Sequence, residues 1–449
     1  MKTENLIRPL AEKKILILGF GQEGIDTYLA LRKLFPAKFL GIADKKNLKE
    51  FDKATQKILL KDRKLKLFFG KDYLSKIGEH DLIIKAPGIS GKELSSFHNG
   101  RSFAPSSAVR ITSQTEIFFD NFPGLIVGIT GTKGKGTTAS LTYEILKKAG
   151  LKVYLGGNIG KPVLQYLLKA KPSDIFVYEL SSHQLQSLKK SPQIAVFLNL
   201  FQDHLDYYKN FTEYQKAKTN IIKYQTKNDY LIFNGKDRQV LALSKKAKAQ
   251  KIDFSCDSKY YKTLLTGKFN QFNIKAAVGV AELFKIPNKV MLQVIKNFRG
   301  LPHRLEFVGE FRGIKFYNNS MATIPQATIL DLQTFNDRPI SLIIGGSDKG
   351  NDYANLCKEI TKTSVKNLII LGQGTGQKIL EGVNLLPKRK EIHPFLVNSM
   401  QEAIQVCFEK TPIKGVCLLS PASASFNIFK NYQERGNQFK KFAKLYEKT

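Results

Sequence analysis

Cysteine is scarce in this chain, and its few positions are widely separated. No two cysteines stand in C-x-x-C spacing, and no pair of histidines accompanies them. A zinc site needs closely spaced ligands and a disulfide framework needs paired cysteines, so neither is indicated and a reducing compartment is expected. The cysteines are Cys256, Cys357, Cys407 and Cys417.

Long apolar runs are also missing. No segment approaches about 18 consecutive apolar residues, the length that a membrane-spanning helix needs. Residues 1–14 are polar and contain no apolar core of signal-peptide length. We therefore expect a cytoplasmic protein that is neither secreted nor inserted in a membrane.

Acidic residues are outnumbered by basic ones. Asp and Glu number 38 against 71 Lys and Arg, which leaves a net charge of +33. A positive charge of this size makes nucleic acids, membranes and anionic small molecules candidate partners. The basic residues are spread along the whole chain without a basic arm or tail, so we expect a solvated lysine-rich surface and no nucleic-acid role. A substrate that carries several phosphates would benefit from the same field.

The length of 449 residues, with 42% hydrophobic residues, predicts about three domains rather than one core. Apolar strands alternate with helical segments throughout, which predicts an α/β fold with parallel sheets. We place the domains at 1–110, 111–300 and 301–449. The first and third are expected to be Rossmann-like, and the central one, which contains the glycine turn described next, to be a P-loop-type domain with a parallel sheet.

The most informative stretch is residues 125–150, where an apolar strand leads through a turn with three glycines and two lysines into a helix. Gly131 and Gly134 would let the backbone approach phosphate oxygens, while Lys135 supplies a positive charge. Thr137 or its neighbour would offer Mg²⁺ a hydroxyl. The alternative is a glycine-rich turn without a ligand.

This turn departs from the general P-loop pattern. Ile129 stands where the first glycine of G-x-x-x-x-G-K-[ST] would be, and Gly136 directly follows the lysine. A general P-loop NTPase is therefore not the favoured interpretation.

A second glycine turn lies near the N-terminus. Residues 14–18 form an apolar strand that runs into G-x-G-x-x-G at 19–24, and the next strand ends at Asp44, 20 residues past Gly24. This is the dinucleotide-fold layout, with an acid placed near a ribose or a base. A nicotinamide enzyme and an empty tight turn are the alternatives. A further strand ends in Pro87–Gly88 and supplies a second ligand loop.

The middle third delivers polar groups to the ends of its strands. A buried strand ends at Glu179, whose carboxylate would face the same edge as the phosphate loop and suits Mg²⁺. An ordinary structural partner for this acid is the alternative. Another strand is followed by His204, and a lone histidine is more often a surface or core residue.

Several motifs in the middle and last thirds follow one family pattern. They are T-G-T-x-G-K-G-T at 130–137, D-H-L-D-Y at 203–207, Y-x-x-A-K at 214–218, N-x-x-N at 270–273 and G-L-x-H-R at 300–304. Together they resemble the Mur ligase and folylpolyglutamate synthetase superfamily. The closing segment, S-P-A-S-A-S at 420–425 with R-G-x-x-F at 435–439, resembles the glutamate-adding Mur ligases.

The resemblance implies an ATP site and magnesium, with two ions expected. Lys135, His204 and Lys218 would be catalytic, and Lys218 would be carried as a carbamate, an oxygen ligand for magnesium. The metal ligands would be Thr137, Glu179, His204 and Lys218. The ATP-binding residues would be Gly131, Thr132, Lys133, Gly134, Lys135, Gly136, Thr137, Asn270, Asn273 and Arg304.

The resemblance also implies two further substrates. UDP-N-acetylmuramoyl-L-alanine would be bound by Gly21, Gln22, Glu23, Gly24, Asp44, Lys45, Pro87, Gly88 and Asn158. Glutamate would be bound by Thr323, Lys349, Ser425 and Tyr432. A dicarboxylic amino acid needs a cation for one carboxylate and hydroxyl or backbone donors for the other, and Lys349 is the expected cation.

Four positions depart from the family pattern, and one of them is Asn427, which stands where an acid is usual. Asn319 and Met321 stand where N-D-S-K-A-T would place an acid and a lysine, and Phe269 replaces a histidine. Asn319 and Met321 are therefore left out of the predicted site.

The function that the resemblance implies is an ADP-forming acid–amino-acid ligase of peptidoglycan precursor synthesis. It would add glutamate, expected to be the D-enantiomer, to UDP-N-acetylmuramoyl-L-alanine through an acyl phosphate, acting as a monomer. A folylpolyglutamate synthetase-like ligase is one alternative, favoured by Gly136 but opposed by the N-terminal glycine turn. A catalytically inactive nucleotide-binding scaffold is the other, suggested by Asn319, Met321 and the net charge.

Overall fold

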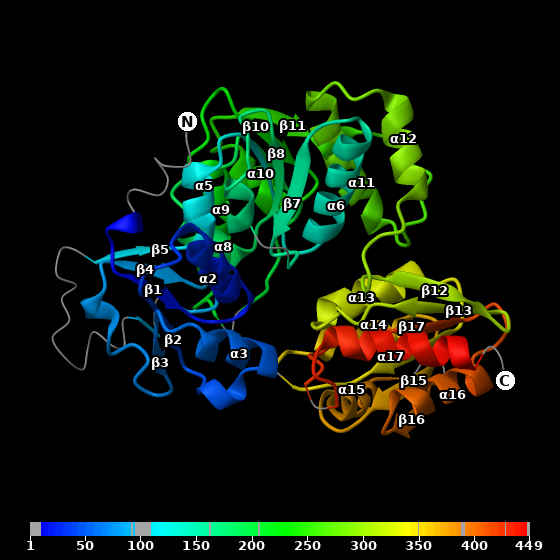
Figure 1. The fold of residues 1–449 in the computed structure, drawn as a ribbon. Helices are drawn as coiled ribbons and strands as arrows, with labels where there is room; N and C mark the ends of the chain where they lie inside the picture. The colour runs from blue at the N-terminus through cyan, green and yellow to red at the C-terminus, as the bar shows by residue number, and fades with distance from the viewer. Residues whose placement is uncertain are drawn as a thin grey trace. The chain divides into compact units, whose positions relative to one another are not determined.

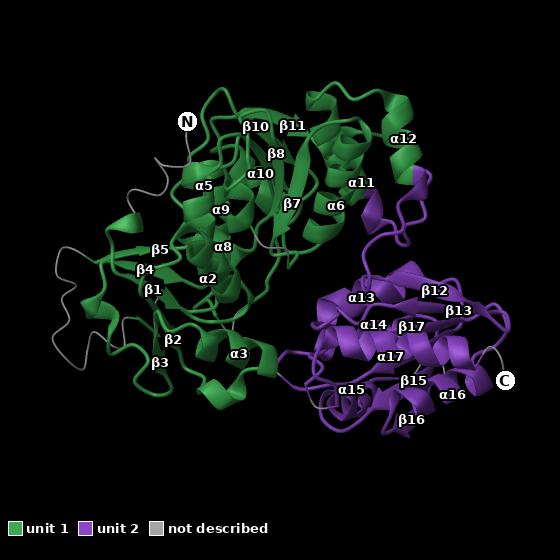
Figure 2. Cartoon of the chain, viewed as in Figure 1, with its two compact units in different colours: residues 1–261, 272–295 green, residues 262–271, 296–449 purple. Residues whose placement is uncertain are grey.

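The backbone carries three sheets with helices on both faces, which confirms the predicted α/β class (Figure 1). The computed structural model describes residues 10–90, 93–94, 109–160, 163–204, 207–348, 350–387, 391–426 and 428–446. The chain forms two compact units, coloured separately in Figure 2. Unit 1 comprises Met1–Tyr261 and Phe272–Ile295, and unit 2 comprises Lys262–Gln271 and Lys296–Thr449. The division into three domains stays a prediction.

The first sheet has the strand order β3-β2-β1-β4-β5, and all its pairs are parallel. Its central strands are continuous apolar runs because helices cover both faces. The strands are β1 (Ile15–Leu18), β2 (Leu40–Asp44), β3 (Leu65–Phe69), β4 (Leu82–Lys85) and β5 (Arg110–Thr112). The helices are α2 (Gln22–Leu34) and α3 (Lys53–Lys61).

The second sheet, also in unit 1, has the order β11-β10-β9-β6-β8-β7 and is parallel throughout. Because β6 lies between β8 and β9, the carboxyl ends of these three strands meet at one edge. The strands are β6 (Leu125–Thr130), β7 (Val153–Gly157), β8 (Ile175–Glu179), β9 (Ile194–Phe197), β10 (Tyr230–Phe233) and β11 (Gln250–Asp253). The helices are α5 (Gln114–Asn121), α6 (Lys135–Lys148), α7 (Leu164–Leu167), α8 (Ser182–Gln186), α9 (Phe211–Lys223), α10 (Arg238–Ser244), α11 (Phe269–Leu283) and α12 (Asn288–Asn297).

One buried apolar cluster runs from the first sheet into the second. It joins Ile15 and Ile42 of the first sheet to Phe118 of α5 and Phe176 of β8. At the same junction the carboxylate of Asp26 accepts hydrogen bonds from the Gln114 side chain, at 2.7 Å, and from the backbone N–H of Val163, at 3.2 Å. The two sheets are therefore packed into one unit.

The third sheet, in unit 2, has the order β12-β13-β17-β14-β15-β16. Its pairs are parallel except for the β12–β13 hairpin, which the sequence reasoning did not foresee. The hairpin turn has two residues, Arg312 and Gly313, both with positive φ, the geometry that joins antiparallel strands most tightly. The strands are β12 (Glu306–Phe311), β13 (Ile314–Asn318), β14 (Ile340–Ile344), β15 (Val365–Leu371), β16 (His393–Val397) and β17 (Val416–Leu419).

Two helix layers cover the third sheet. One core contains residues of α13, α14 and α15, and the other contains residues of α16 and α17. These helices are α13 (Pro325–Thr334), α14 (Ala354–Lys362), α15 (Thr375–Asn384), α16 (Met400–Lys410) and α17 (Tyr432–Leu445). Across the ranges that the structure describes, no helix combines the length and hydrophobicity needed to cross a bilayer.

Candidate active site

The turn between β6 and α6 has the geometry of a phosphate loop. Gly134 caps α6 in a left-handed conformation (φ 88°), and a Cβ there would lie 2.2 Å from the side-chain oxygen of Asn273. A Cβ on Gly131 would lie 2.9 Å from Leu198. Both positions therefore require glycine, and the N-terminus of α6, with the positive end of its helix dipole, suits an anion.

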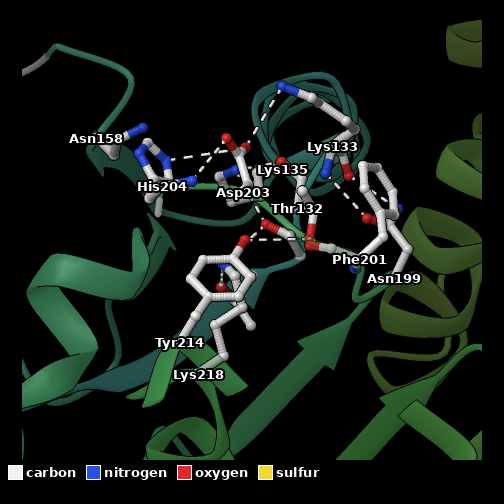
Figure 3. A network of polar contacts seen from close by, with 12 residues as sticks. Thr132, Lys133, Lys135, Asn158, Asn199, Phe201, Asp203, His204, Tyr214 and Lys218 are labelled. Atoms are coloured by element: carbon white, nitrogen blue, oxygen red, sulfur yellow. Dashed lines mark hydrogen bonds and ion pairs between the residues drawn. The ribbon is translucent and has the colours of Figure 1, made fainter. Parts of the chain in front are cut away.

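Lysine side chains gather around this loop (Figure 3). The Lys135 ammonium donates to the carbonyls of Gly131 and Thr132, both at 3.0 Å. The backbone of Lys133 is held on both sides by the Asn199 side chain, at 2.9 and 3.0 Å. The loop is thus rigidly held and strongly positive.

Thr132, predicted to bind ATP, has a structural role in this loop. Its hydroxyl lies 3.1 Å from the Tyr214 hydroxyl and donates to the carbonyl of Phe201, also at 3.1 Å. These contacts tie the phosphate loop to α9 and to the segment after β9. Asn199 and Tyr214 were absent from the predicted site, although both stand inside the motifs or strands that the sequence singles out.

Lys218 of α9 lies directly beneath the loop. Its side chain is 1% exposed, and its ammonium donates to the carbonyl of Gly131 at 2.9 Å and to the Thr130 hydroxyl at 3.3 Å. Burial, reinforced by the nearby charge of Lys135, holds the pKa of Lys218 well below its usual value. A lowered pKa favours the neutral, nucleophilic form of the amine.

Asp203 is an acid that the predicted site omitted. It lies 3.6 Å from the Lys133 ammonium and 3.9 Å from the His204 ring. Burial by itself would raise the pKa of Asp203, but the charges of Lys133, His204 and Lys135 hold it below its usual value. His204 itself adopts positive φ (57°) and packs edge-to-face on the His183 ring, with 4.9 Å between centroids. A non-glycine residue in this conformation stores strain, which is common at functional sites.

Glu179 ends β8 at the same edge and is fully buried. One of its oxygens accepts from the Asn158 amide at 2.9 Å. Within the described part of the chain, its second oxygen has no hydrogen-bond partner. An unsatisfied buried carboxylate oxygen beside a phosphate loop fits a hard cation such as Mg²⁺.

Among the described residues, no three His, Cys, Asp or Glu side chains cluster closely enough to hold a metal ion. Thr137, predicted as another oxygen ligand, is buried in the first turn of α6. Magnesium takes oxygen ligands and keeps several of them from outside the protein. The full ligand set stays a prediction.

The N-terminal glycine turn adjoins the same edge. Asp44 accepts from the backbone N–H of Phe20 at 2.6 Å, so it is held against the turn, and its role near a nucleoside stays a prediction. A Cβ on Gly24 would lie 2.1 Å from the carbonyl oxygen of Gly19, which requires glycine where α2 meets β1. Lys45, Pro87 and Gly88 lie in loops at the carboxyl ends of β2 and β4.

Hydrogen bonds connect this turn and its neighbouring loop to the elements of the second sheet. The Gln22 amide donates to the carbonyl of Gly160 at 2.8 Å, and the Gln184 amide donates to Glu23 at 2.6 Å. The Tyr207 hydroxyl lies 3.4 Å from the carbonyl of Pro87. The two predicted nucleotide sites therefore share one folded unit. Burial, opposed in part by the Gln184 bond, raises the pKa of Glu23 to about 7.

Of the two predicted asparagines on α11, the structure brings one to the loop. Asn273 accepts from the Thr138 hydroxyl at 3.4 Å and lies beside Gly134. The Asn270 amide instead donates to the carbonyl of Thr266, at 2.6 Å, within unit 2. Asn270 and Arg304 belong to unit 2, and their ATP role stays a prediction.

Three of the residues predicted to bind glutamate lie at the carboxyl edge of the third sheet, two of them in loops and one at the start of a helix. Thr323 follows β13, Ser425 follows β17 and is 4% exposed, and Tyr432 begins α17. The ring of Tyr432 packs edge-to-face on His303, with 5.9 Å between centroids. Lys349 lies outside the described residues.

Comparison with known proteins gives matches along nearly the whole chain. Residues 129–288 match the Mur ligase middle domain. The chain is 36% identical to a UDP-N-acetylmuramoylalanine–D-glutamate ligase of Clostridium tetani, covering 95% of this chain and 96% of that protein. It is 34% identical to the protein of the same name from Aquifex aeolicus, covering 86% and 95%.

Solved structures show the same architecture. The UDP-N-acetylmuramate–alanine ligase MurC of Thermotoga maritima superposes with a TM-score of 0.60 at 17% identity, covering 97% of this chain and 100% of that one. The MurF ligase of the same organism, in complex with ADP, gives 0.57 at 15% identity, covering 84% and 92%. At these identities the likeness concerns the fold alone.

Proposed function

Because this chain belongs to the Mur ligase family, we propose that it adds D-glutamate to UDP-N-acetylmuramoyl-L-alanine in an ATP-dependent, ADP-forming reaction. The observation that carries the proposal is the 36% identity over 95% of the chain to a relative of that name. The product would be a precursor of peptidoglycan, made in the cytoplasm by a monomer.

The phosphate loop supports the ATP half of the reaction. Lys135 is held against two loop carbonyls, and it would exchange these neutral partners for phosphate oxygens, which form stronger, charge-assisted contacts. The rigid loop between β6 and α6 needs little reorganisation to receive the triphosphate. Positioning and charge neutralisation are the main contributions a protein makes to phosphoryl transfer.

Two bond-forming steps follow from the assigned chemistry. The free carboxylate of the alanine attacks the γ-phosphorus of ATP, ADP leaves, and an acyl phosphate forms. The glutamate amine then attacks the acyl carbon, a proton is released, and inorganic phosphate leaves to give the amide.

The Glu179 carboxylate supports a magnesium site, because its second oxygen is buried without a hydrogen-bond partner in the described structure. Magnesium is the cofactor general to this family. Thr137, His204 and a carbamate on Lys218 would complete the ligands of two ions. Magnesium, when bound, neutralises the charge of the transferring phosphoryl group.

Lys218 supports the carbamate because its amine is buried and readily neutral. In this modification the neutral amine attacks CO₂, a carbon–nitrogen bond forms and a proton is released. The two new oxygens would lie among the positive charges of Lys133 and Lys135, which favour an anion at this place.

Phosphate release tests the proposal. Wild-type protein with ATP, Mg²⁺ and UDP-N-acetylmuramoyl-L-alanine should release phosphate with D-glutamate and not with L-glutamate. K135A should lose roughly 10²–10³-fold or more in kcat, since one preorganised charge contact is worth that much. K147A, which removes an exposed lysine of the same helix, should retain activity. Turnover of a folate substrate, or silence with both enantiomers, would instead support the ligase alternative or the inactive scaffold.

A further inference from the structure

Among the described residues, Arg435 has the largest fully buried side chain, and no acidic side chain of that set forms an ion pair with its guanidinium. It lies on α17 and is 1% exposed. Burial lowers the pKa of its guanidinium to about 9, so the group still carries its charge at neutral pH. A buried charge without a counter-ion is unfavourable, and an apolar side chain of similar size is often at least as stable there. Its presence therefore calls for a role other than stability.

All five N–H groups of Arg435 are used, and every partner belongs to a loop at one edge of the third sheet. The side chain reaches the segments after β13, β14 and β17. Its bonds go to the Ser320 hydroxyl at 3.0 Å and to the carbonyls of Ser320 at 2.9 Å, Gly345 at 3.3 Å, Ala424 at 3.4 Å and Ser423 at 3.1 Å. No donor remains for a ligand, so Arg435 does not contact substrate itself.

The loops that Arg435 joins also carry the residues assigned to glutamate. Ser425 directly follows Ala424, and Thr323 stands three positions after Ser320. The Ser320 hydroxyl, which accepts from Arg435, donates in turn to the carbonyl of Tyr432 at 2.8 Å. The planar guanidinium of Arg435 thus fixes the distances between the loops after β13, β14 and β17.

We propose that Arg435 is a positioning residue for the incoming amino acid: by bonding to the loops after β13, β14 and β17, it holds Thr323, Ser425 and Tyr432 at the spacing that the amino acid requires. The inference rests on the proposed function, since that function places glutamate at these loops. Arg435 also leaves a positive charge behind loops that receive a dicarboxylic substrate.

The test compares Michaelis constants for the three substrates in wild-type protein, R435M and R435K. R435M should raise the KM for D-glutamate by roughly tenfold or more, the effect of about one lost charged hydrogen bond. The KM for ATP and for the UDP substrate should change by less than about twofold. R435K should show a smaller rise, because a lysine keeps the charge but its single nitrogen cannot reach five acceptors.

A stability-matched control separates positioning from folding. F439L changes a fully buried side chain on the same helix, in the apolar core that contains Phe316 and Leu419. It should lower the melting temperature without moving the KM for glutamate. If F439L raises that KM as much as R435M does, or if R435M raises all three KM values equally, the inference is overturned.

S320A provides a milder variant should R435M fail to fold. It removes the hydroxyl between Arg435 and Tyr432 and should raise the KM for glutamate several-fold. An unchanged KM for glutamate in S320A overturns the inference. A KM for glutamate in R435K equal to that of wild type overturns it as well. Wild-type protein that releases no phosphate with D-glutamate overturns the proposed function instead, so the two failures are distinct.

Discussion

The Asn319 side-chain amide donates a 2.7 Å hydrogen bond to the carboxylate of Asp331, an acid that is fully enclosed between α13 and the third sheet. The Ser420 hydroxyl donates to the same oxygen, also at 2.7 Å. Burial nevertheless dominates and raises the pKa of Asp331 to about 7. Asn319, which departs from the family pattern, therefore has a structural partner in this chain.

This pair makes stability depend on pH. The folded-state pKa of Asp331 lies above the ordinary value of 3.8, so the folded protein holds more protons between the two values. The stability that Asp331 contributes is present below pH 4 and is lost as the pH rises through about 7. D331N should remove this dependence of stability on pH. At pH 8 its melting temperature should lie a few degrees above that of wild type, the shift that about one or two kcal/mol causes in a unit of this size.

Calorimetry from pH 5.5 to 8.5 checks this expectation. E23Q is the comparison variant: the pKa of Glu23 in unit 1 is also raised to about 7, so E23Q should remove only the contribution of Glu23 over the same pH range. Parallel curves for wild type and D331N would show that Asp331 does not titrate in this range.

Glu23 should make binding of the UDP substrate pH-dependent. Its carboxyl lies in the predicted diphosphate turn, faces Gln184, Asp26 and Lys85, and has a pKa of about 7. Below that pH the group is neutral, whereas above it a negative charge opposes the diphosphate. The KM for the UDP substrate should rise several-fold between pH 6.5 and 8.5, by a Coulomb effect of about 1 kcal/mol. E23Q should abolish this rise, while the KM for ATP serves as an internal reference.

Glu179 should set the magnesium requirement. E179Q keeps the volume and the bond with Asn158 but removes the negative charge of the oxygen that has no hydrogen-bond partner among the described residues. The Mg²⁺ concentration for half-maximal activity should rise by roughly tenfold or more, the value of one charged contact. E144Q, an exposed change on α6, should leave the titration unchanged. An unaltered titration in E179Q would exclude this carboxylate as a ligand.

Lys218 should gain the mass of one CO₂. Intact-mass analysis under native conditions, or crystallography with bicarbonate present, should place the modification at this side chain. K218M should lose activity by roughly 10²-fold or more, as expected when a metal ligand is removed. K216M, on the exposed face of the same helix, should retain it. Full activity in carefully CO₂-free buffer would contradict the modification.

The sequence predicted the sheets and the loops better than the contacts within the site. Gly131, Gly134 and Lys135 could be identified because few residue types allow a backbone to approach phosphate, and the structure gives them that geometry. The strand-end position of Glu179 followed from the parallel arrangement of β6 and β8. Both inferences depend only on local pattern and on strand order.

Other contacts depend on side chains that meet across long distances in the sequence. Thr132 lies in a ligand-binding motif, but its hydroxyl forms hydrogen bonds with Tyr214 and Phe201, which are 82 and 69 positions away in the sequence. Asp203 lies in the D-H-L-D-Y motif, but the sequence predicted no role for it. Only the fold brings the Lys133 ammonium close to its carboxylate. The antiparallel β12 was missed because its pairing is set by a two-residue turn without the usual asparagine or aspartate before glycine.

Unit 2 takes residues 262–271 from a part of the chain that lies well before its main body. Phe269 packs against the core that contains Leu332 and Leu342, and Leu265 approaches Gly300. A fragment that began at residue 296 would leave this apolar surface uncovered. Exchange of unit 2 between relatives would therefore have to transplant two stretches of polypeptide, with the junction inside α11.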